Sequence, residues 1–211
     1  KFQEDIQELV LEHKNVNELS SEINNLLFFN NHLSGDCYCL DVLQRHVDSH
    51  ANDFVGYEHY ENKLIFWMGD LSGRGFGSTI AANLIRSCIS QNKFKYLYSE
   101  EANPARVLGL ITEAVGAVTG EQFFSSLLLA VIDFDNYEIT LSDAAHVPPI
   151  YLQKANLSKP LKLSIGLPLG FQPQLNSNSY ENSKFKLNSD DLIFLYSNGL
   201  TRATKNNKDE R

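Results

Sequence analysis

Asp70 lies where a predicted strand meets a glycine-rich turn, a position suited to chemistry. It belongs to the segment Gly69-Asp70-Leu71-Ser72-Gly73-Arg74-Gly75-Phe76-Gly77, which follows the apolar run 64–68 and precedes a helical pattern that starts at Ser78. The length and the aromatic and β-branched content of 64–68 predict a strand buried on both faces, with Asp70 as the last residue to leave the sheet. A carboxylate there is held by rigid backbone, and the glycines let main chain approach a ligand without Cβ clashes. The arrangement suits a hard metal ion or a phosphate group.

Two other segments repeat this design. Asp36 follows Ser34 and Gly35 in a polar turn before an alternating strand, and Asn198 follows the apolar run 192–196 and precedes Gly199. Since each polar residue lies at a strand end, Asp36, Asp70 and Asn198 could converge on one cation site.

The order and spacing of these motifs resemble a known family. Ser-Gly-Asp-x-Tyr from Ser34, Gly-Asp-x-Ser-Gly-x-Gly from Gly69 and Ser-x-Gly-Leu-Thr from Ser197, with 145–149 and 166–170 between them, are similar to the metal-dependent (type 2C, PPM) protein phosphatases. The closest likeness is to their bacterial SpoIIE-like sporulation and stress-response branch, from about Ser34 to the end of the chain. The resemblance implies an α+β layered sandwich of two antiparallel β-sheets flanked by helices, with the metal ions at one edge. It also implies a further C-terminal strand with another metal-binding Asp, so we expect the domain to be truncated at Arg211.

The resemblance implies a protein serine/threonine phosphatase with a two-metal Mg²⁺ or Mn²⁺ site. Two bridged cations activate a water and clamp the phosphoryl oxygens during in-line displacement. Asp70 is the expected bridging ligand, the Leu71 carbonyl completes one metal site, and Asp36 is a second ligand or an acceptor for metal-bound water. Asp36 and Asp70 are thus the expected catalytic residues, and Asn198 is a further metal ligand.

Two residues depart from the family pattern. Asn198 stands where the family has a metal-binding Asp, so a full negative charge is lost and a weak or partly occupied site is expected unless another acid compensates, such as Asp190 or Asp191. Arg74 stands where many relatives carry His; a guanidinium cannot act as a general acid, but it can bind phosphate bidentately. These departures leave two functions open, an active phosphatase and a catalytically impaired pseudophosphatase that acts as a partner-binding regulatory module.

The composition of the chain argues against nucleic acid as a partner and against a membrane span. The formal charge of −8 argues against nucleic acid, and no apolar stretch approaches the roughly 20 residues of a membrane span. By resemblance, the domain would be the output domain of a bacterial signalling protein, behind a sensory or phosphoryl-receiver domain of a response regulator. Its phosphorylated protein substrate would be an anti-sigma-factor antagonist. The chain begins with Lys1, which indicates a piece of a longer protein.

The three cysteines cannot form a disulfide framework and point to a reducing cytoplasm. We expect Cys37 and Cys39 to be small buried residues rather than half of a zinc site. Zinc would need two more ligands, and no matching Cys-x-x-Cys or His pair lies close by in the sequence. His146 is expected to play a structural hydrogen-bonding role in a tight turn, while His46, His50 and His59 are expected in a solvated loop.

Residues 1–30 carry an apolar stripe at helical spacing. It predicts a helical connector through which the chain could form a homodimer, or alternatively a pair of helices packed on the domain's own sheet. By the resemblance, we expect residues 31–211 to form the phosphatase-like domain. Within it we expect a polar connection over 45–62, helices over 78–98 and 104–118, and strands over 123–134, 137–141, 150–152, 180–187 and 192–196.

Overall fold

A computed structural model describes residues 31–44, 52–73, 76–119, 123–153, 156–171 and 179–202. Its largest sheet has the strand order β10-β6-β5-β4-β3, all antiparallel neighbours, with β9 parallel to β6. These strands are β3 (Asp53–Tyr60), β4 (Lys63–Leu71), β5 (Ser125–Asp133), β6 (Glu138–Ala144), β9 (Ile165–Gly166) and β10 (Ser183–Lys186).

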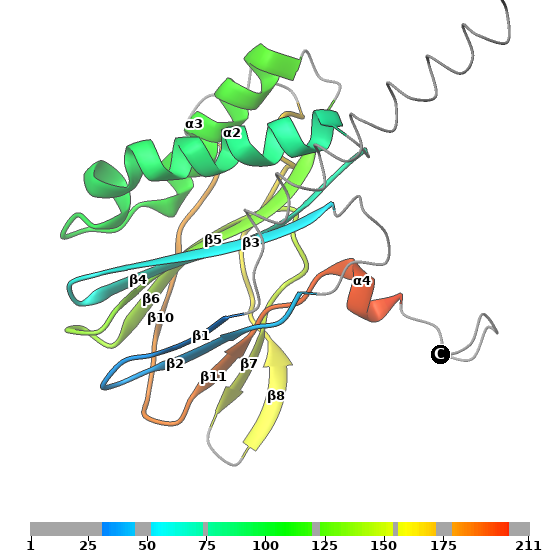
Figure 1. The fold of residues 1–211 in the computed structure, drawn as a ribbon. Coiled ribbons are helices and arrows are strands. Elements are labelled where there is room, and N and C mark those ends of the chain that lie inside the picture. The colour runs from blue at the N-terminus through cyan, green and yellow to red at the C-terminus, as the bar shows by residue number, and fades with distance from the viewer. Residues whose placement is uncertain are drawn as a thin grey trace, which may run out of the picture.

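Two smaller sheets lie against one face of this large sheet, and the two long helices cover the other (Figure 1). The smaller sheets are the hairpin of β1 (Asn31–Ser34) and β2 (Cys39–Val42), and the sheet β11-β7-β8, formed by β7 (Ile150–Gln153), β8 (Asn156–Pro160) and β11 (Leu192–Phe194). The helices are α2 (Phe76–Asn92), the π-helical turn η1 (Lys93–Leu97), α3 (Pro104–Thr119) and the short α4 (Asn198–Thr201). The predicted α+β layered class is confirmed; in the described residues α2 and α3 lie on one side of the sandwich only.

Strand β4 holds these layers together. Ile65, Trp67 and Leu71 point into the core beneath α2 and α3, while Leu64 and Phe66 point into a second core shared with β7 and β11. Because successive side chains of a strand alternate between faces, such a strand must be apolar throughout. The predicted burial of this run on both faces is confirmed.

The two predicted helices are present with small shifts in their bounds. Helix α2 ends at Asn92 and passes into η1, and α3 begins at Pro104, where a missing backbone N–H costs nothing. Ile85, Ile89, Leu108 and Ile111 lie almost fully buried between the helices and the sheet.

The predicted polar connection over 45–62 is wrong in its second half, which forms the eight-residue strand β3. β3 lies at the edge of the sheet, where among the described residues it pairs with β4 alone. Its exposed end carries polar residues, which hide the strand pattern. His59 therefore lies in a strand rather than in a loop, and His46 and His50 fall outside the described residues. The predicted strand 180–187 is confirmed only as β10, four residues long.

Residues 1–30 fall outside the described part of the chain, so the helical connector and the boundary at residue 31 remain predictions. Among the residues that the structure does describe, no helix combines the length and apolar character needed to cross a membrane.

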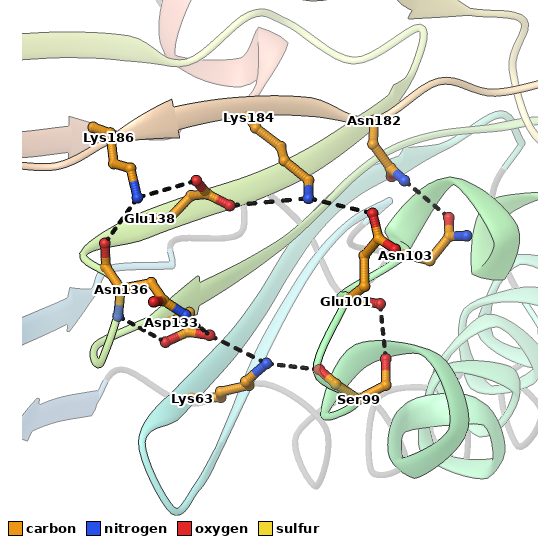
Figure 2. Close-up of polar contacts among 10 residues, drawn as sticks. All are labelled: Lys63, Ser99, Glu101, Asn103, Asp133, Asn136, Glu138, Asn182, Lys184 and Lys186. Carbon is orange, nitrogen blue, oxygen red and sulfur yellow. Dashed lines mark hydrogen bonds and ion pairs between the residues drawn. The ribbon is translucent and has the colours of Figure 1, made fainter.

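Polar contacts fasten the ends of the strands farthest from Asp70 to the loop between the helices (Figure 2). Lys63 donates to the Ser99 carbonyl at 2.7 Å and lies 3.3 Å from Asp133. Lys184 bridges Glu101 and Glu138, at 3.6 and 4.0 Å. Further contacts join Asn182 to Asn103 and Lys186 to Asn136 and Glu138. These contacts tie β10 and the helical layer to the end of the sheet that lies away from Asp70.

Tyr180 offers a test of the helix-side core. Its hydroxyl lies 2.7 Å from Thr112 Oγ1 and donates to the Leu167 carbonyl at 3.1 Å, within a buried environment. Tyr180→Phe leaves both partners without it, and we expect the free energy of unfolding to fall by about 1–3 kcal/mol in urea titrations. Tyr137→Phe, at a side chain 61% exposed, is the matched control and should change nothing measurable. Equal effects of the two substitutions would contradict the buried hydrogen-bond pair.

Candidate functional site

Asp53 in β3 and Asp70 in β4 lie opposite each other on neighbouring strands of the large sheet. Strands β3 and β4 are joined by the turn at Glu61 and Asn62, so Tyr60 pairs with Lys63 and, counting back along the ladder, Asp53 pairs with Asp70. Directly paired residues point to the same face. Phe54, next to Asp53, and Leu71, next to Asp70, both enter the core beneath the helices. Both carboxylates therefore point to the opposite face, toward the smaller sheets.

The beginning of α4 lies against this carboxylate pair. Ser197 donates a hydrogen bond from Oγ to Asp53 Oδ2 at 2.6 Å, across 144 residues of chain. The Asn198 side chain hydrogen-bonds Asp70, and the positive charge of Arg202 acts on the same carboxylate. A Cβ added at Gly199 would lie 3.6 Å from Asp53 Oδ2, so the helix backbone closely approaches the pair. Two acids from one hairpin thus meet two polar groups and a cation from the C-terminal part of the chain.

The negative charges of Asp53 and Asp70 are only partly compensated by the groups around them. Burial is the largest cause that raises the pKa of its carboxyl, and the charge of Asp53 raises it further; the hydrogen bond from Asn198 and the charge of Arg202 lower it. Two carboxylates held together repel each other, and partial burial strengthens the repulsion. A divalent cation between them would remove that cost. The oxygen donors suit a hard metal such as Mg²⁺ or Mn²⁺.

A row of polar residues continues from this pair across the sheet and is buried at His146 and Asp143. Asp70 is paired with Ser126, whose Oγ lies 2.9 Å from His146 Nδ1, and the His146 backbone N–H donates to Asp143 Oδ1 at 2.7 Å. Burial raises the pKa of Asp143 to about 6 and lowers that of His146 to about 4. Ala145, between them, has φ +57°, so the chain turns tightly here. These contacts agree with the structural role expected for His146.

The structure brings together two of the predicted site residues, Asp70 and Asn198. Leu71 lies beside Asp70 with its side chain in the core and its N–H bonded to the Asn52 carbonyl; metal binding by its own carbonyl remains a prediction. Arg74 falls outside the described residues, so its phosphate-binding role also remains a prediction.

Asp36 is not brought to this site. It lies exposed in the β1–β2 turn, where Tyr38 stacks on Phe134 with ring centroids 4.7 Å apart and lies 5.4 Å from the ring of His59. His59 is six residues along β3 from Asp53, or about 20 Å at 3.3 Å per residue. The turn with Asp36 and helix α4 therefore lie at opposite ends of the large sheet (Figure 1).

Asp53 is the site residue that the sequence reasoning missed. The signal lay in the hairpin itself, since two runs joined by Glu61 and Asn62 place residue 53 opposite residue 70. Because 45–62 was predicted to be a loop, strand β3 was not predicted, and without it Asp53 cannot be paired with Asp70.

Solved structures share this fold. The RsbU and RsbW domains of Rv1364c from Mycobacterium tuberculosis are 18% identical with a TM-score of 0.62, over 75% of this chain and 42% of that one. RsbX in complex with magnesium is 14% identical with a TM-score of 0.59, over 77% and 75%. A PP2C phosphatase domain with a regulatory fragment of SpoIIE from Bacillus subtilis is 15% identical with a TM-score of 0.54, over 72% and 45%. The shared fold is that of the PP2C phosphatase domains.

A family model described as Stage II sporulation protein E (SpoIIE) matches residues 60–211, most of the chain, and the chain belongs to this family. The resemblance inferred from the motifs is confirmed. The match includes Asp70 and Asn198 and begins seven residues after Asp53. The chain spans less than half the length of the Rv1364c and SpoIIE structures, and no curated protein sequence matches it.

Repulsion within the carboxylate pair predicts that the charge of Asp70 lowers the free energy of unfolding when no metal is bound. Because the pKa of Asp70 is raised in the folded state, its ionisation costs stability at neutral pH. Asp70→Asn should therefore raise the free energy of unfolding by about 0.5–2 kcal/mol at pH 7 in a chelator, measured by urea denaturation. Asp36→Asn, at an exposed acid far from the pair, should change it by less than about 0.5 kcal/mol. A less stable Asp70→Asn protein would show that the pair is not repulsive.

The Asp143 and His146 pair predicts compensating pH effects. The folded state binds the Asp143 proton more tightly than the unfolded state does, so stability falls as the pH rises from 3.8 to about 6. The folded state binds a proton on His146 less tightly, so stability rises as the pH rises from about 4 to 6.5. Asp143→Asn leaves the histidine effect alone, so stability should rise by on the order of 3 kcal/mol from pH 4 to 6.5. The parent should be much flatter in the same denaturation series. Parallel profiles for the two proteins would contradict these burial effects.

Proposed function

We propose that this chain is a Mg²⁺- or Mn²⁺-dependent protein phosphoserine/phosphothreonine phosphatase domain. The observation that supports this function best is the pairing of Asp53 with Asp70 at the edge between the sheets, with Asn198 on the same carboxylate. Membership of the SpoIIE family adds support.

Asp53 supplies the acid that the sequence prediction lacked. With Asn198 neutral, Asp70 alone would attract two divalent cations weakly, whereas a second carboxylate directly opposite restores a full negative charge. Asp53, Asp70 and the Asn198 amide oxygen are the ligands that we assign to the metal ions. When bound, the ions supply a nucleophilic water at neutral pH and neutralise charge on the phosphoryl group.

Neighbouring residues hold this arrangement in place. Ser197 fixes one oxygen of Asp53 through its hydrogen bond, and Asn198 orients Asp70. Arg202, whose charge acts on Asp70, is placed to attract a phosphorylated side chain, and its planar guanidinium can bind two phosphate oxygens at once. Arg74, in the glycine-rich turn, is the second phosphate-binding candidate.

Membership of the SpoIIE family also favours a role in bacterial signalling. We infer a cytoplasmic output domain of a bacterial stress or sporulation pathway, behind a sensory or receiver domain, acting on a phosphorylated anti-sigma-factor antagonist. Similar solved structures include one of the bacterial stressosome and one of the cell fate determinant SpoIIE, which supports a signalling context.

The alternative function is a pseudophosphatase that binds a phosphorylated partner without turnover. The neutral amide of Asn198 against Asp70 favours it, because the site carries one charge fewer than the family pattern. An intact phosphate-binding face with weak metal binding would still recognise a phosphoprotein.

Manganese-dependent hydrolysis of a generic phosphate ester separates the two functions. In the phosphatase, Asp53→Asn and Asp70→Asn should each lower kcat/KM by about 10²–10³-fold, since each removes charge from the reacting centre. Asp36→Asn is the matched control and should retain activity within about twofold, because the acid lies exposed at the other end of the sheet. If the parent is inactive and only Asn198→Asp turns over, the domain is a pseudophosphatase. An equal loss in Asp36→Asn would contradict the placement of the site.

A further inference from the structure

Three side chains of metal-binding type lie together on the outer face of the β1–β2 hairpin. His32 in β1 is paired with Asp41 in β2, and Cys39 is two residues before Asp41 on the same strand. Paired residues and residues two apart point to one face, so the register alone brings an imidazole, a thiol and a carboxylate together. The prediction that Cys37 and Cys39 are buried is wrong, because both are exposed. His32 and Asp41 are the further ligands of metal-binding type that lie beside Cys39.

The distances from the Cys39 sulfur to its two neighbours are close to the edges of a tetrahedral zinc site. Cys39 Sγ lies 3.8 Å from His32 Nδ1 and 3.6 Å from Asp41 Oδ2. Zinc bond lengths of about 2.3 Å to sulfur and about 2.0 Å to nitrogen or oxygen give tetrahedral edges of about 3.3–3.6 Å. His32 Nδ1 lies 2.7 Å from the other carboxylate oxygen, Asp41 Oδ1, so the imidazole and the carboxylate would need to move apart slightly to share an ion. All three donor atoms lie within 4.8 Å of one another.

The inner face of the hairpin holds this cluster in place. Leu33, between His32 and Ser34, and Tyr38, beside Cys39, pack against the core shared by the sheets. The ligand side chains are themselves exposed, which leaves an entry path and a fourth coordination position for water.

We propose that His32, Cys39 and Asp41 form a zinc site on the β1–β2 hairpin. A thiolate, an imidazole and a carboxylate are a set that binds Zn²⁺ well, whereas Mg²⁺ and Mn²⁺ prefer oxygen ligands alone. The site is therefore chemically distinct from the Asp53–Asp70 pair. Because β1 and β2 pair only with each other among the described residues, an ion bound to both strands would hold the hairpin together.

Cobalt(II) substitution tests the site, because a thiolate bound to cobalt gives a charge-transfer band that an all-oxygen site cannot give. The untagged chain is titrated with Co²⁺, and Zn²⁺ is then added to displace it. We expect a sulfur-to-cobalt band and its loss when zinc is added; cobalt bound at the Asp53–Asp70 pair does not contribute to this band. Cys39→Ser should abolish the band, while Cys37→Ser, an exposed cysteine two residues away, is the matched control and should keep it.

Zinc affinity and hairpin protection provide independent readouts. His32→Ala and Asp41→Asn should each weaken zinc binding by more than about tenfold, since even outer-shell changes cost that much. Zinc should slow amide exchange in β1 and β2 of the parent and of Cys37→Ser, but not of Cys39→Ser. Circular dichroism checks that each variant is folded. Absence of a sulfur band in the parent, or its loss in Cys37→Ser as well as in Cys39→Ser, would overturn the proposal.

Discussion

The register between β3 and β4 is the constraint on which the candidate site depends. A slip of one residue would send every side chain of β3 to the other face of the sheet. The buried side chains of β4 hold its own orientation, because they fill a core on each side. Gly56 allows the Trp67 ring to lie over β3, since a Cβ there would come within 2.2 Å of that ring. Apolar packing along the hairpin thus fixes which acids meet at its end.

At the site, packing of the strands holds the carboxylates of Asp53 and Asp70 close together although their charges repel each other. The carboxylates belong to a rigid hairpin, and the groups that contact them come from α4, after the last strand of the smaller sheet. Neither part makes a site alone. A polar row of Ser126, His146 and Asp143 lies beyond the pair and joins it to the turn after β6. The docking of the two sheets therefore determines both the spacing and the charge of the site.

Much of this arrangement was predictable from sequence where periodicity was strong. The apolar run before Asp70 and the patterns of α2 and α3 gave the correct elements, because long or fully buried segments carry clear signals. β3 was missed because an edge strand with polar residues at its exposed end resembles a loop. Asp36 was chosen because its flanking Ser, Gly and Tyr match a short motif. Such a motif describes local chemistry and cannot show at which end of a sheet the residue lies.

The sequence separation between Ser197 and Asp53 has a consequence for synthesis of the chain. A ribosome releases the hairpin with both acids long before it makes α4, so the growing chain carries two close negative charges with no partner. Contacts between such distant segments form late, since closing a long loop is slow. The polar contacts of the site therefore form only in a chain made as far as α4, and a polypeptide interrupted earlier would expose the acids without the groups that orient them.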